Sequence, residues 1–410
     1  MLFDAISAKI GHAAFVRAVK SNDFKRSISM TVKELGELRR RLRPDKNAIS
    51  YGCYVNSNRE IISYLDESLG TMPQDESEKY LSLLKKGLSG GLGRNLIDIV
   101  FSTAQVMDSD EHRLLTALRD SELKDAEARN RFYQTVIDSL EMEDCNYLIL
   151  LACDVYDVPH RSKDDELQSD ASDEVFRYIL CSICPVKDGK SELGFFSGDN
   201  EFHSCMASQI VSQPELGFLF PAFDDRTANI YNALLYTRTP DQVHHEFIAA
   251  VFHTEPPLSA AEQREGFQAA LSGALDDSFN MEVVQAVHER LLDKIEQHKE
   301  SKDPEPLTVS VQEVATILKD CGVADTQVAA FEAQCGAQFG DGAVLNPENI
   351  IDSKHFEIKT SDVSVAIDPK RSYIVEMRII DGRKYLLIPA DEGVEVNGMA
   401  VGIAAADRRA

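Results

Sequence analysis

The stretches YLILLACDVY, Tyr147–Tyr156, and VFRYILCSIC, Val175–Cys184, decide the fold of this chain. Both are rich in aliphatic, aromatic and β-branched residues, and an acidic loop over Ser162–Asp173 lies between them. Short apolar runs bounded by polar loops are typical of buried strands. The two stretches therefore predict a strand pair in the middle of the chain.

The sequence before this pair alternates between short helices and short strands. A capping box of Thr31 and Glu34 marks a helix start, and the segment Asn56-Ser57-Asn58-Arg59 is a hairpin signal between two β-like runs. We predict an α+β domain over residues 30–238, preceded by an N-terminal extension over residues 1–29. The expected helices are 31–42, 75–88, 109–120 and 125–140, and the other expected strands are 49–55, 60–65, 96–101, 216–220 and 229–236.

From Pro240 onward the apolar period becomes helical. Helices are expected at 240–252, 258–275 and 280–299, then at 311–321, after a capping box of Ser310 and Glu313, and at 324–338. The last 60 residues predict three or four antiparallel strands within 356–388. The second domain is thus residues 239–410, a helical block plus a small antiparallel sheet. The fold class is α+β with mixed or antiparallel sheets.

Charge is spread unevenly along the chain. There are 43 Lys and Arg against 68 Asp and Glu, a net charge of −25. Residues 1–46 hold eleven cations and five anions, a balance of +6, so the remaining 364 residues have a balance of −31. An acidic body disfavours general adhesion to nucleic acid, so any polyanion contact must be local.

Cysteine usage and hydropathy predict a cytoplasmic protein. The eight cysteines have no framework of spacings and are expected to be reduced thiols. The chain has no run of about 18 apolar residues, which a membrane-spanning helix would need. The N-terminal stretch lacks the continuous apolar segment of a secretory signal.

The segment Gly87-Leu88-Ser89-Gly90-Gly91 matches the G-x-S-x-G nucleophile pattern. That motif requires a strand before the serine and a helix after it, whereas here the expected order is reversed. The glycines are better explained as a helix stop and a turn. Flanked by Lys85, Lys86 and Arg94, they alternatively form an anion-binding loop of backbone N–H groups.

Metal and acid–base motifs are incomplete, so no catalytic residue, metal or cofactor is assigned. Cys181 and Cys184 with His203 and Cys205 supply zinc-ligand types, but residues i and i+3 of a strand point to opposite faces. His244-His245-Glu246 fails the H-E-x-x-H spacing because position 249 is alanine. Asp224-Asp225-Arg226 is most simply a polar turn.

The basic cluster Arg39-Arg40-Arg41, Arg43 and Lys46 is the strongest local charge signal. Five cations within eight positions suit phosphate contacts that weaken with salt. Alternatively, Arg and Lys are favoured at a helix C-terminus by the helix dipole. The sequence leaves both interpretations open.

Two resemblances go beyond these motifs. Across residues 31–400 the chain resembles a bacterial family of unknown function, with residues 1–29 outside the match. The phrases that carry this resemblance are GCYVN (52–56), LRDSELKD (118–125), FRYILCSICPVK (176–187), ELGFLFPAFDDR (215–226), HKESKDPEPL (298–307) and DEGVEVNG (391–398).

The second resemblance covers residues 215–400, whose layout is similar to that of bacterial nucleoid-associated proteins of the yejK kind. It rests on pattern and order, over Phe247–Phe252, Pro257–Ala270, Glu305–Thr308, Val311–Leu318, Gly322-Val323 and Ala330–Glu332. It implies association with the nucleoid or with DNA-topology enzymes, without catalysis.

The resulting hypothesis is a non-enzymatic, nucleoid-associated protein that contacts double-stranded DNA or a DNA-topology enzyme. Direct DNA contact would use the phosphate-binding candidates Arg39, Arg40, Arg41, Arg43, Lys46, Lys85, Lys86 and Arg94. The alternatives are a protein–protein adaptor with an acidic docking surface and an enzyme with an unrecognised cleft. An enzyme of that kind would bring together in one cleft the side chains of Asp224, Asp225, Arg226, His203 and Cys184. All three allow a homodimer and none involves a membrane.

Overall fold

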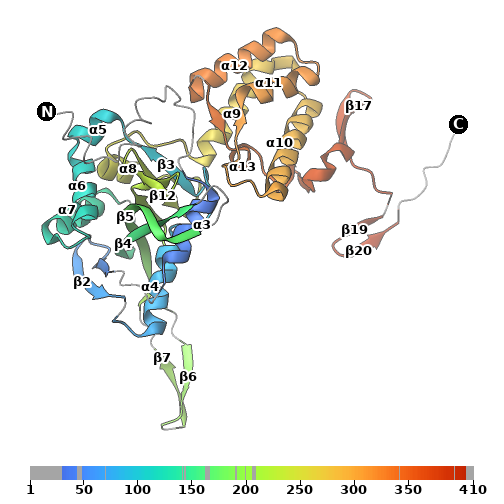
Figure 1. Cartoon of the computed structure of the whole chain (residues 1–410). Coiled ribbons are helices and arrows are strands. Elements are labelled where there is room, and N and C mark those ends of the chain that lie inside the picture. Colours follow the sequence, from blue (N-terminus) through green and yellow to red (C-terminus); the bar gives the residue numbers. More distant parts are fainter. Residues whose placement is uncertain are drawn as a thin grey trace, which may run out of the picture. The chain divides into compact units, whose positions relative to one another are not determined.

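The computed structural model describes residues 30–43, 49–69, 71–140, 142, 145–161, 167–189, 192–198, 200–205, 209–340, 342–391 and 393–402. They divide into two units (Figure 1). The first lies within Met1–Glu262 with Asp303–Pro306, and the second within Gln263–Lys302 with Leu307–Ala410. No helix in the described ranges is long and apolar enough to cross a membrane.

An antiparallel sheet forms the centre of the first unit, with strand order β2-β1-β4-β5-β9-β12-β3 and β8 paired to β5. It confirms the α+β class. Its strands are β1 (Ile49–Val55), β2 (Ile61–Ser68), β3 (Leu96–Val100), β4 (Asn146–Arg161), β5 (Leu167–Asp188), β8 (Gln209–Val211), β9 (Leu216–Phe220) and β12 (Asn232–Thr237).

Strands β4 and β5 are the predicted central pair, and they are longer than the apolar runs alone indicate. Their register extends from Asn146 opposite Val186 to Arg161 opposite Leu167. Most of the expected acidic loop is therefore strand, because ladder hydrogen bonds continue beyond the apolar residues. Residues 162–166 of that loop lie outside the described ranges.

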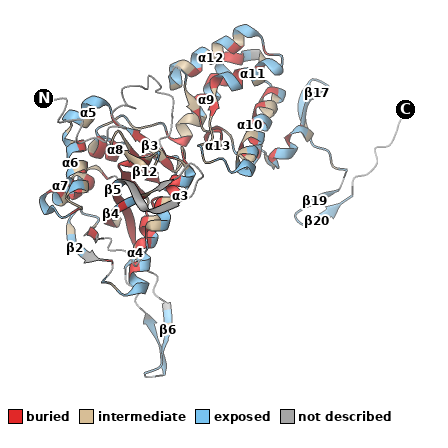
Figure 2. Cartoon of the chain, viewed as in Figure 1, coloured by how far each residue is buried: buried red, intermediate tan, exposed pale blue. Residues whose placement is uncertain are grey.

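Both faces of the sheet are buried, because successive side chains of a strand point to opposite sides. Ile149 and Ile179 belong to one hydrophobic core, and Leu150 and Leu180 to the other. Figure 2 shows the buried strands between the exposed outer faces of the helices.

Amphipathic helices cover each face of the sheet with their apolar sides. The first core contains apolar residues of α6 (Asp110–Asp120), α7 (Ala126–Ser139) and α8 (His245–Phe252), with α5 (Thr103–Asp108) next to α6. The second core contains those of α3 (Val32–Arg41), α4 (Gln74–Lys86) and the short hairpin β10 (Ala222–Asp224) and β11 (Thr227–Asn229). Another hairpin, β6 (Glu192–Phe196) with β7 (Glu201–Cys205), forms a two-stranded sheet of its own.

Local signals for helix starts and turns are confirmed. Thr31 and Glu34 form the capping box of α3, and the backbone N–H of Asn56 donates to the Glu60 carbonyl oxygen at 3.0 Å in the predicted hairpin turn. A further capping box, of Ser102 and Gln105 at α5, was not among the expectations.

Helix α8 determines where the first unit ends. Phe247, Ile248, Val251 and Phe252 lie in the first core. The structure therefore divides the chain within α9 (Ala260–Leu275), between Glu262 and Gln263, instead of between residues 238 and 239. The change of period at Pro240 marks the start of helical sequence, but a period does not specify which core a helix joins.

The second unit contains the expected helical block. Ser310 and Glu313 form the predicted capping box, and α10 places Val283, Val287 and Leu291 in the third core. Its elements are α9, η1 (Asp276–Ser278), α10 (Met281–Ser301), β13 (Val309–Ser310), α11 (Val311–Asp320), α12 (Asp325–Phe339), β14 (Val344–Leu345) and α13 (Pro347–Ile350).

The C-terminal strands form separate hairpins instead of one sheet. They are β15 (Phe356–Lys359) with β16 (Ser364–Ile367), β17 (Glu376–Ile380) with β18 (Arg383–Leu387), and β19 (Val394–Val396) with β20 (Met399–Val401). The 3-10 helix η2 (Pro369–Ile374) lies between the first two. In each hairpin the residues on either side of the turn pair with each other, and a local sequence pattern can predict this pairing. The pattern is a poorer guide to whether separate hairpins join into one sheet.

Substitution of Gly217 tests the close approach of β9 to β5. A Cβ atom at residue 217 would overlap the Cys181 carbonyl oxygen, and overpacking a core costs about 2 kcal/mol. We expect Gly217→Ala to lower the free energy of unfolding, measured by urea denaturation, by about that amount. Gly198→Ala is the control, because a Cβ there meets nothing within 4 Å. Equal stability of the two variants would contradict this packing.

Candidate functional site

Arg41, the central member of the predicted basic cluster, faces the sheet. Its Nη2 lies 3.1 Å from Oδ2 of Asp154 on β4, and its Nε donates to the same oxygen at 3.2 Å. Its Cζ lies 4.0 Å from the ring centroid of Tyr156. The side chains of Arg41 and Asp154 are only 16% and 15% exposed. Arg41 therefore binds the protein itself and is not available to a phosphate.

The contacts of Arg41 belong to a larger polar network around α3. The Tyr178 hydroxyl donates to Asp154 Oδ2 at 3.0 Å, and burial raises the pKa of Tyr178, so this proton is retained. The Tyr156 hydroxyl donates to Glu37, and Arg226 Nη1 donates to Glu37 Oε2 at 3.0 Å. The network connects α3 with β4, β5 and the β10–β11 turn.

Glu34 is another point of attachment for α3. Its carboxylate accepts the backbone N–H of Arg226 at 3.1 Å and that of Thr31 at 2.8 Å. Desolvation by burial raises its pKa and outweighs these hydrogen bonds. Perturbed carboxyls often mark active sites, but these contacts explain Glu34 as the capping residue of a packed helix.

The remaining cations of the cluster have different environments. Arg43 Nε donates to the Arg40 carbonyl oxygen at 2.9 Å, so Arg43 caps the last turn of α3. Arg39, Arg40 and Arg43 are exposed, and Lys46 lies outside the described residues. The helix-dipole interpretation of the sequence thus accounts for Arg43, while Arg39 and Arg40 are directed to solvent.

Lys85, Lys86 and Arg94 lie at a different position along the sheet. Gly87, which follows Lys86, is close to Ser182 of β5, whereas Arg41 binds Asp154, which is opposite Tyr178 in the β4–β5 register. Four residues along a strand span about 13 Å. Lys86 is exposed, and Lys85 and Arg94 are half-buried. Gly87 and Arg41 are thus in contact with the sheet at separate positions.

The G-x-S-x-G segment has the reversed order expected from the sequence. Helix α4 ends at Lys86, Gly87 follows it, and β3 begins at Leu96. The Ser89 hydroxyl donates to the Lys86 carbonyl oxygen at 2.7 Å. Ser89 thus caps the helix, and the strained strand-to-helix turn of a nucleophile is not formed here.

The zinc-like cysteines lie on opposite faces of β5, as the strand assignment predicts. Cys181 belongs to the first core and Cys184 to the second. Burial raises the pKa of Cys184 to about 12 and that of Cys181 well above its ordinary value, so both remain thiols. His203 lies on β7, 3.8 Å from Glu201. The two sulfurs cannot meet at one ion.

The residues that would mark an unrecognised cleft are dispersed. Asp225 and Arg226 form the β10–β11 turn with φ of 50° and 60°, and Arg226 belongs to the α3 network. Cys184 is buried in the second core, and His203 is on a separate hairpin. This arrangement does not support an active site made of these residues.

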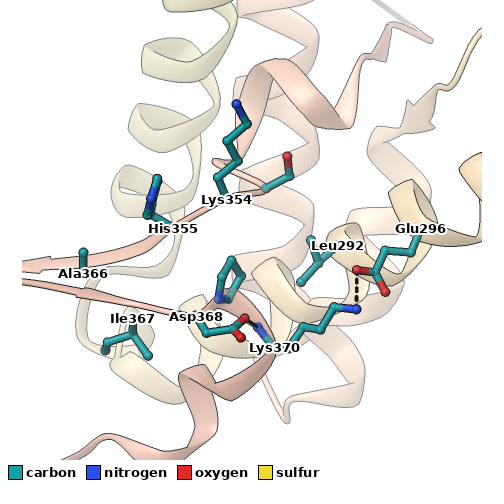
Figure 3. Close-up of a pocket in the computed structure, with 10 residues that line it drawn as sticks. Leu292, Glu296, Lys354, His355, Ala366, Ile367, Asp368 and Lys370 are labelled. Carbon is teal, nitrogen blue, oxygen red and sulfur yellow. Dashed lines mark hydrogen bonds and ion pairs between the residues drawn. The ribbon is translucent and has the colours of Figure 1, made fainter.

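A pocket of about 360 Å³ lies in the second unit (Figure 3). It is lined by residues of α10, β16, the segment before β15 and η2. Lys370 Nζ is 2.8 Å from Glu296, and His355 Nδ1 is 3.6 Å from Asp352. The lining also contains Lys354 and the apolar residues Leu292, Ile367 and Pro369. Among these lining residues no nucleophile is hydrogen-bonded to a base.

The hairpin β6–β7 is a surface that the sequence reasoning missed. Phe195 and Phe202 are cross-strand partners, with ring centroids 5.2 Å apart, and are 55% and 64% exposed. Leu193 and Phe196 are also exposed. Figure 1 shows the hairpin extending beyond the sheet. The signal in the sequence was a pair of phenylalanines beside a Ser-Gly turn, which periodicity over longer windows does not detect.

Comparison with known families gives one match. The model described as "Domain of unknown function (DUF4317)" matches residues 30–399. The match begins where the predicted N-terminal extension ends and bears out the first resemblance, but it does not support the yejK-type resemblance. No curated protein matches the chain.

Arg41 and Arg40 should respond differently to removal. We expect Arg41→Ala to lower the free energy of unfolding by about 2 kcal/mol, because hydrogen bonds between charged groups at a partly buried site are lost. The matched variant Arg40→Ala removes an exposed charge and should change it by less than about 0.5 kcal/mol. Urea denaturation of both variants measures the difference. Equal effects would contradict the structural role of Arg41.

Proposed function

The chain belongs to the DUF4317 family, a membership that assigns no activity, and we propose that it is a non-enzymatic adaptor that binds other proteins. The single observation that carries this proposal is hairpin β6–β7, which exposes Leu193, Phe195, Phe196 and Phe202. The candidate catalytic and metal residues, in contrast, are dispersed, capped or buried as described above. Binding without catalysis is therefore the function that the geometry supports best.

The exposed phenylalanines have a thermodynamic cost that a partner would remove. Burying one Phe side chain stabilises by about 1.5–3 kcal/mol relative to leaving it exposed. A two-stranded hairpin is marginal in water unless it packs against something. Contiguous exposed apolar residues with a polar surround typically mark protein interaction sites. Phe195 and Phe202, on one face of β6–β7, are suited to an apolar groove of a partner protein.

The negative charge of the chain and of this hairpin favours a protein as the partner of β6–β7, and disfavours a lipid surface or a nucleic acid. Glu192 and Glu201 lie in the two strands, and the chain has a net charge of −25. Anionic lipid surfaces attract basic segments, and phosphate backbones require Lys or Arg. Hairpin β6–β7 offers neither, so its apolar side chains indicate a protein surface.

Capture from the native host tests the adaptor function. After nuclease treatment, we expect the wild-type chain to retain a protein partner that the variant Phe195→Ser/Phe202→Ser loses, with the free energy of unfolding unchanged. Ile62→Ser, which removes another exposed apolar side chain, is the control and should retain the partner. Identical protein sets from wild type and the double variant, as identified by mass spectrometry, would refute the role of this hairpin.

Contact with DNA is a second candidate function, favoured by the exposure of Arg39 and Arg40 at the end of α3. They lie in residues 1–46, which have an excess of positive charge. Arg41 and Arg43 are engaged within the protein, and the exposed side chains of Arg39 and Arg40 are the basis of a weak, sequence-independent phosphate contact. This role would be compatible with nucleoid association.

Fluorescence anisotropy of a labelled random-sequence duplex tests DNA contact. If Arg39 and Arg40 hold phosphates, Arg39→Ala/Arg40→Ala should weaken binding and reduce the slope of log K against log salt by about 2. Lys354→Ala/Lys359→Ala, which removes two exposed cations at and before β15 in the other unit, is the charge-matched control for nonspecific effects. Absence of binding at low salt, or an unchanged slope in the arginine variant, would exclude this site.

A further inference from the structure

Hairpin β17–β18 in the second unit exposes nearly all of its side chains. All five residues of β17 are exposed, with Met377 at 57% and Ile379 at 72%. The two strands form a two-stranded sheet of their own (Figure 2, exposed colouring of β17). Two strands without a packed face are marginal in water, so this hairpin is suited to completion by another chain.

The turn of the hairpin defines which backbone groups face outward. Asp381 and Gly382 have φ of 51° and 77°, the positive values of a two-residue type I′ turn. Such a turn makes Ile380 and Arg383 a hydrogen-bonded pair, and bonded residues alternate along an antiparallel ladder. Lys384 and Leu386 therefore direct their N–H and C=O groups away from β17. Among the described residues no further strand pairs with this edge.

The segment around β18 has a positive net charge, whereas the whole chain has a negative one. Residues 369–388 contain five Lys or Arg and two Asp or Glu, a balance of +3, in a chain of −25. Strand β18 itself has Arg383 and Lys384 and no acidic residue. In β17 the positive charge is locally compensated, since Arg378 Nε donates to Glu376 Oε2 at 2.8 Å. Arg383 and Lys384 of β18 therefore contribute two of the five cations, and they lie on the strand whose outer edge is unpaired among the described residues.

We propose that the outer edge of β18 binds an extended acidic segment of another protein by strand addition. Backbone groups of Lys384 and Leu386 would extend the ladder, which gives affinity, and flanking side chains would give specificity. Asp or Glu of the partner would lie beside Arg383 and Lys384, and apolar residues beside Tyr385 and Leu387. This inference deepens the adaptor proposal with a partner class for the second unit, and it uses no residue of β6–β7.

Charge also argues against a second copy of the chain at this edge. Charged residues on an edge strand, especially Lys, commonly prevent edge-to-edge pairing of identical chains. Two β18 strands in antiparallel contact would bring four cations of Arg383 and Lys384 into one short ladder. The same charges attract an acidic strand, so the edge discriminates between these occupants.

The test is fluorescence anisotropy of the full chain with a fluorescein-labelled synthetic peptide of Val and Thr that has two adjacent Glu at each end, so that one Glu pair can lie beside Arg383 and Lys384 in either strand direction. We expect saturable binding that weakens at least about tenfold between 50 and 200 mM salt, as screening of exposed charges requires. The same peptide with Lys in place of Glu should not bind. R383E/K384E should reduce affinity at least about tenfold, since cross-strand charge pairs are reversed. K354E/K359E, near β15, is the matched control and should leave affinity unchanged.

A backbone-modified peptide separates strand addition from simple charge attraction. N-methylation of alternate peptide residues removes ladder donors without altering the protein, and it should abolish binding in one of the two possible frames. Retained binding by both N-methylated peptides, or unchanged affinity of R383E/K384E, would overturn the proposal. A dimer in light scattering that R383E/K384E abolishes would assign the edge to a second copy, which also overturns it. None of these outcomes depends on Phe195 or Phe202, so failure here leaves the adaptor test standing.

Discussion

The antiparallel ladder between β4 and β5 is the constraint on which the first unit depends. Its unbroken register, from Asn146 opposite Val186 to Val158 opposite Glu174, determines on which face of the sheet the buried side chains of these two strands lie. A slip of one residue would exchange the two cores, since the side-chain period is two. The apolar side chains on these two faces pack against five helices and the β10–β11 hairpin. The helices are α3, α4, α6, α7 and α8.

The same ladder explains why one member of the basic cluster, Arg41, is engaged within the protein. Asp154 lies on β4 at the level where α3 ends, and it is the residue that receives Arg41. A charge pair at this depth requires both members, because a lone buried charge costs several kcal/mol. The arginine run therefore contains two kinds of residue: Arg41 anchors the helix, and Arg39 and Arg40 face solvent. Nothing in the local run distinguishes them.

The surfaces that remain for function lie outside the packed layers. Hairpins β6–β7 and β17–β18 belong to different units, and each exposes large apolar side chains. Their charges differ in sign: Glu192 and Glu201 lie on one hairpin, and Arg383 and Lys384 on the other. Hairpin β6–β7 carries the proposed adaptor function, and hairpin β17–β18 carries the proposed strand addition.

The sequence by itself determined the fold class, the central strand pair, two capping boxes and the first hairpin turn, because strands, caps and turns depend on neighbouring residues. The runs at 147–156 and 175–184, the Thr31–Glu34 and Ser310–Glu313 boxes, and the turn Asn56–Arg59 all lie where they were predicted. Only the tertiary structure decided which core α8 joins, that the C-terminal strands form separate hairpins, and that Arg41 is engaged by Asp154. The contact of Arg41 with Asp154 joins residues 113 positions apart, and Phe252 of α8 contacts Phe101 from a distant part of the chain. A periodic pattern in one segment does not contain the identity of its distant partner.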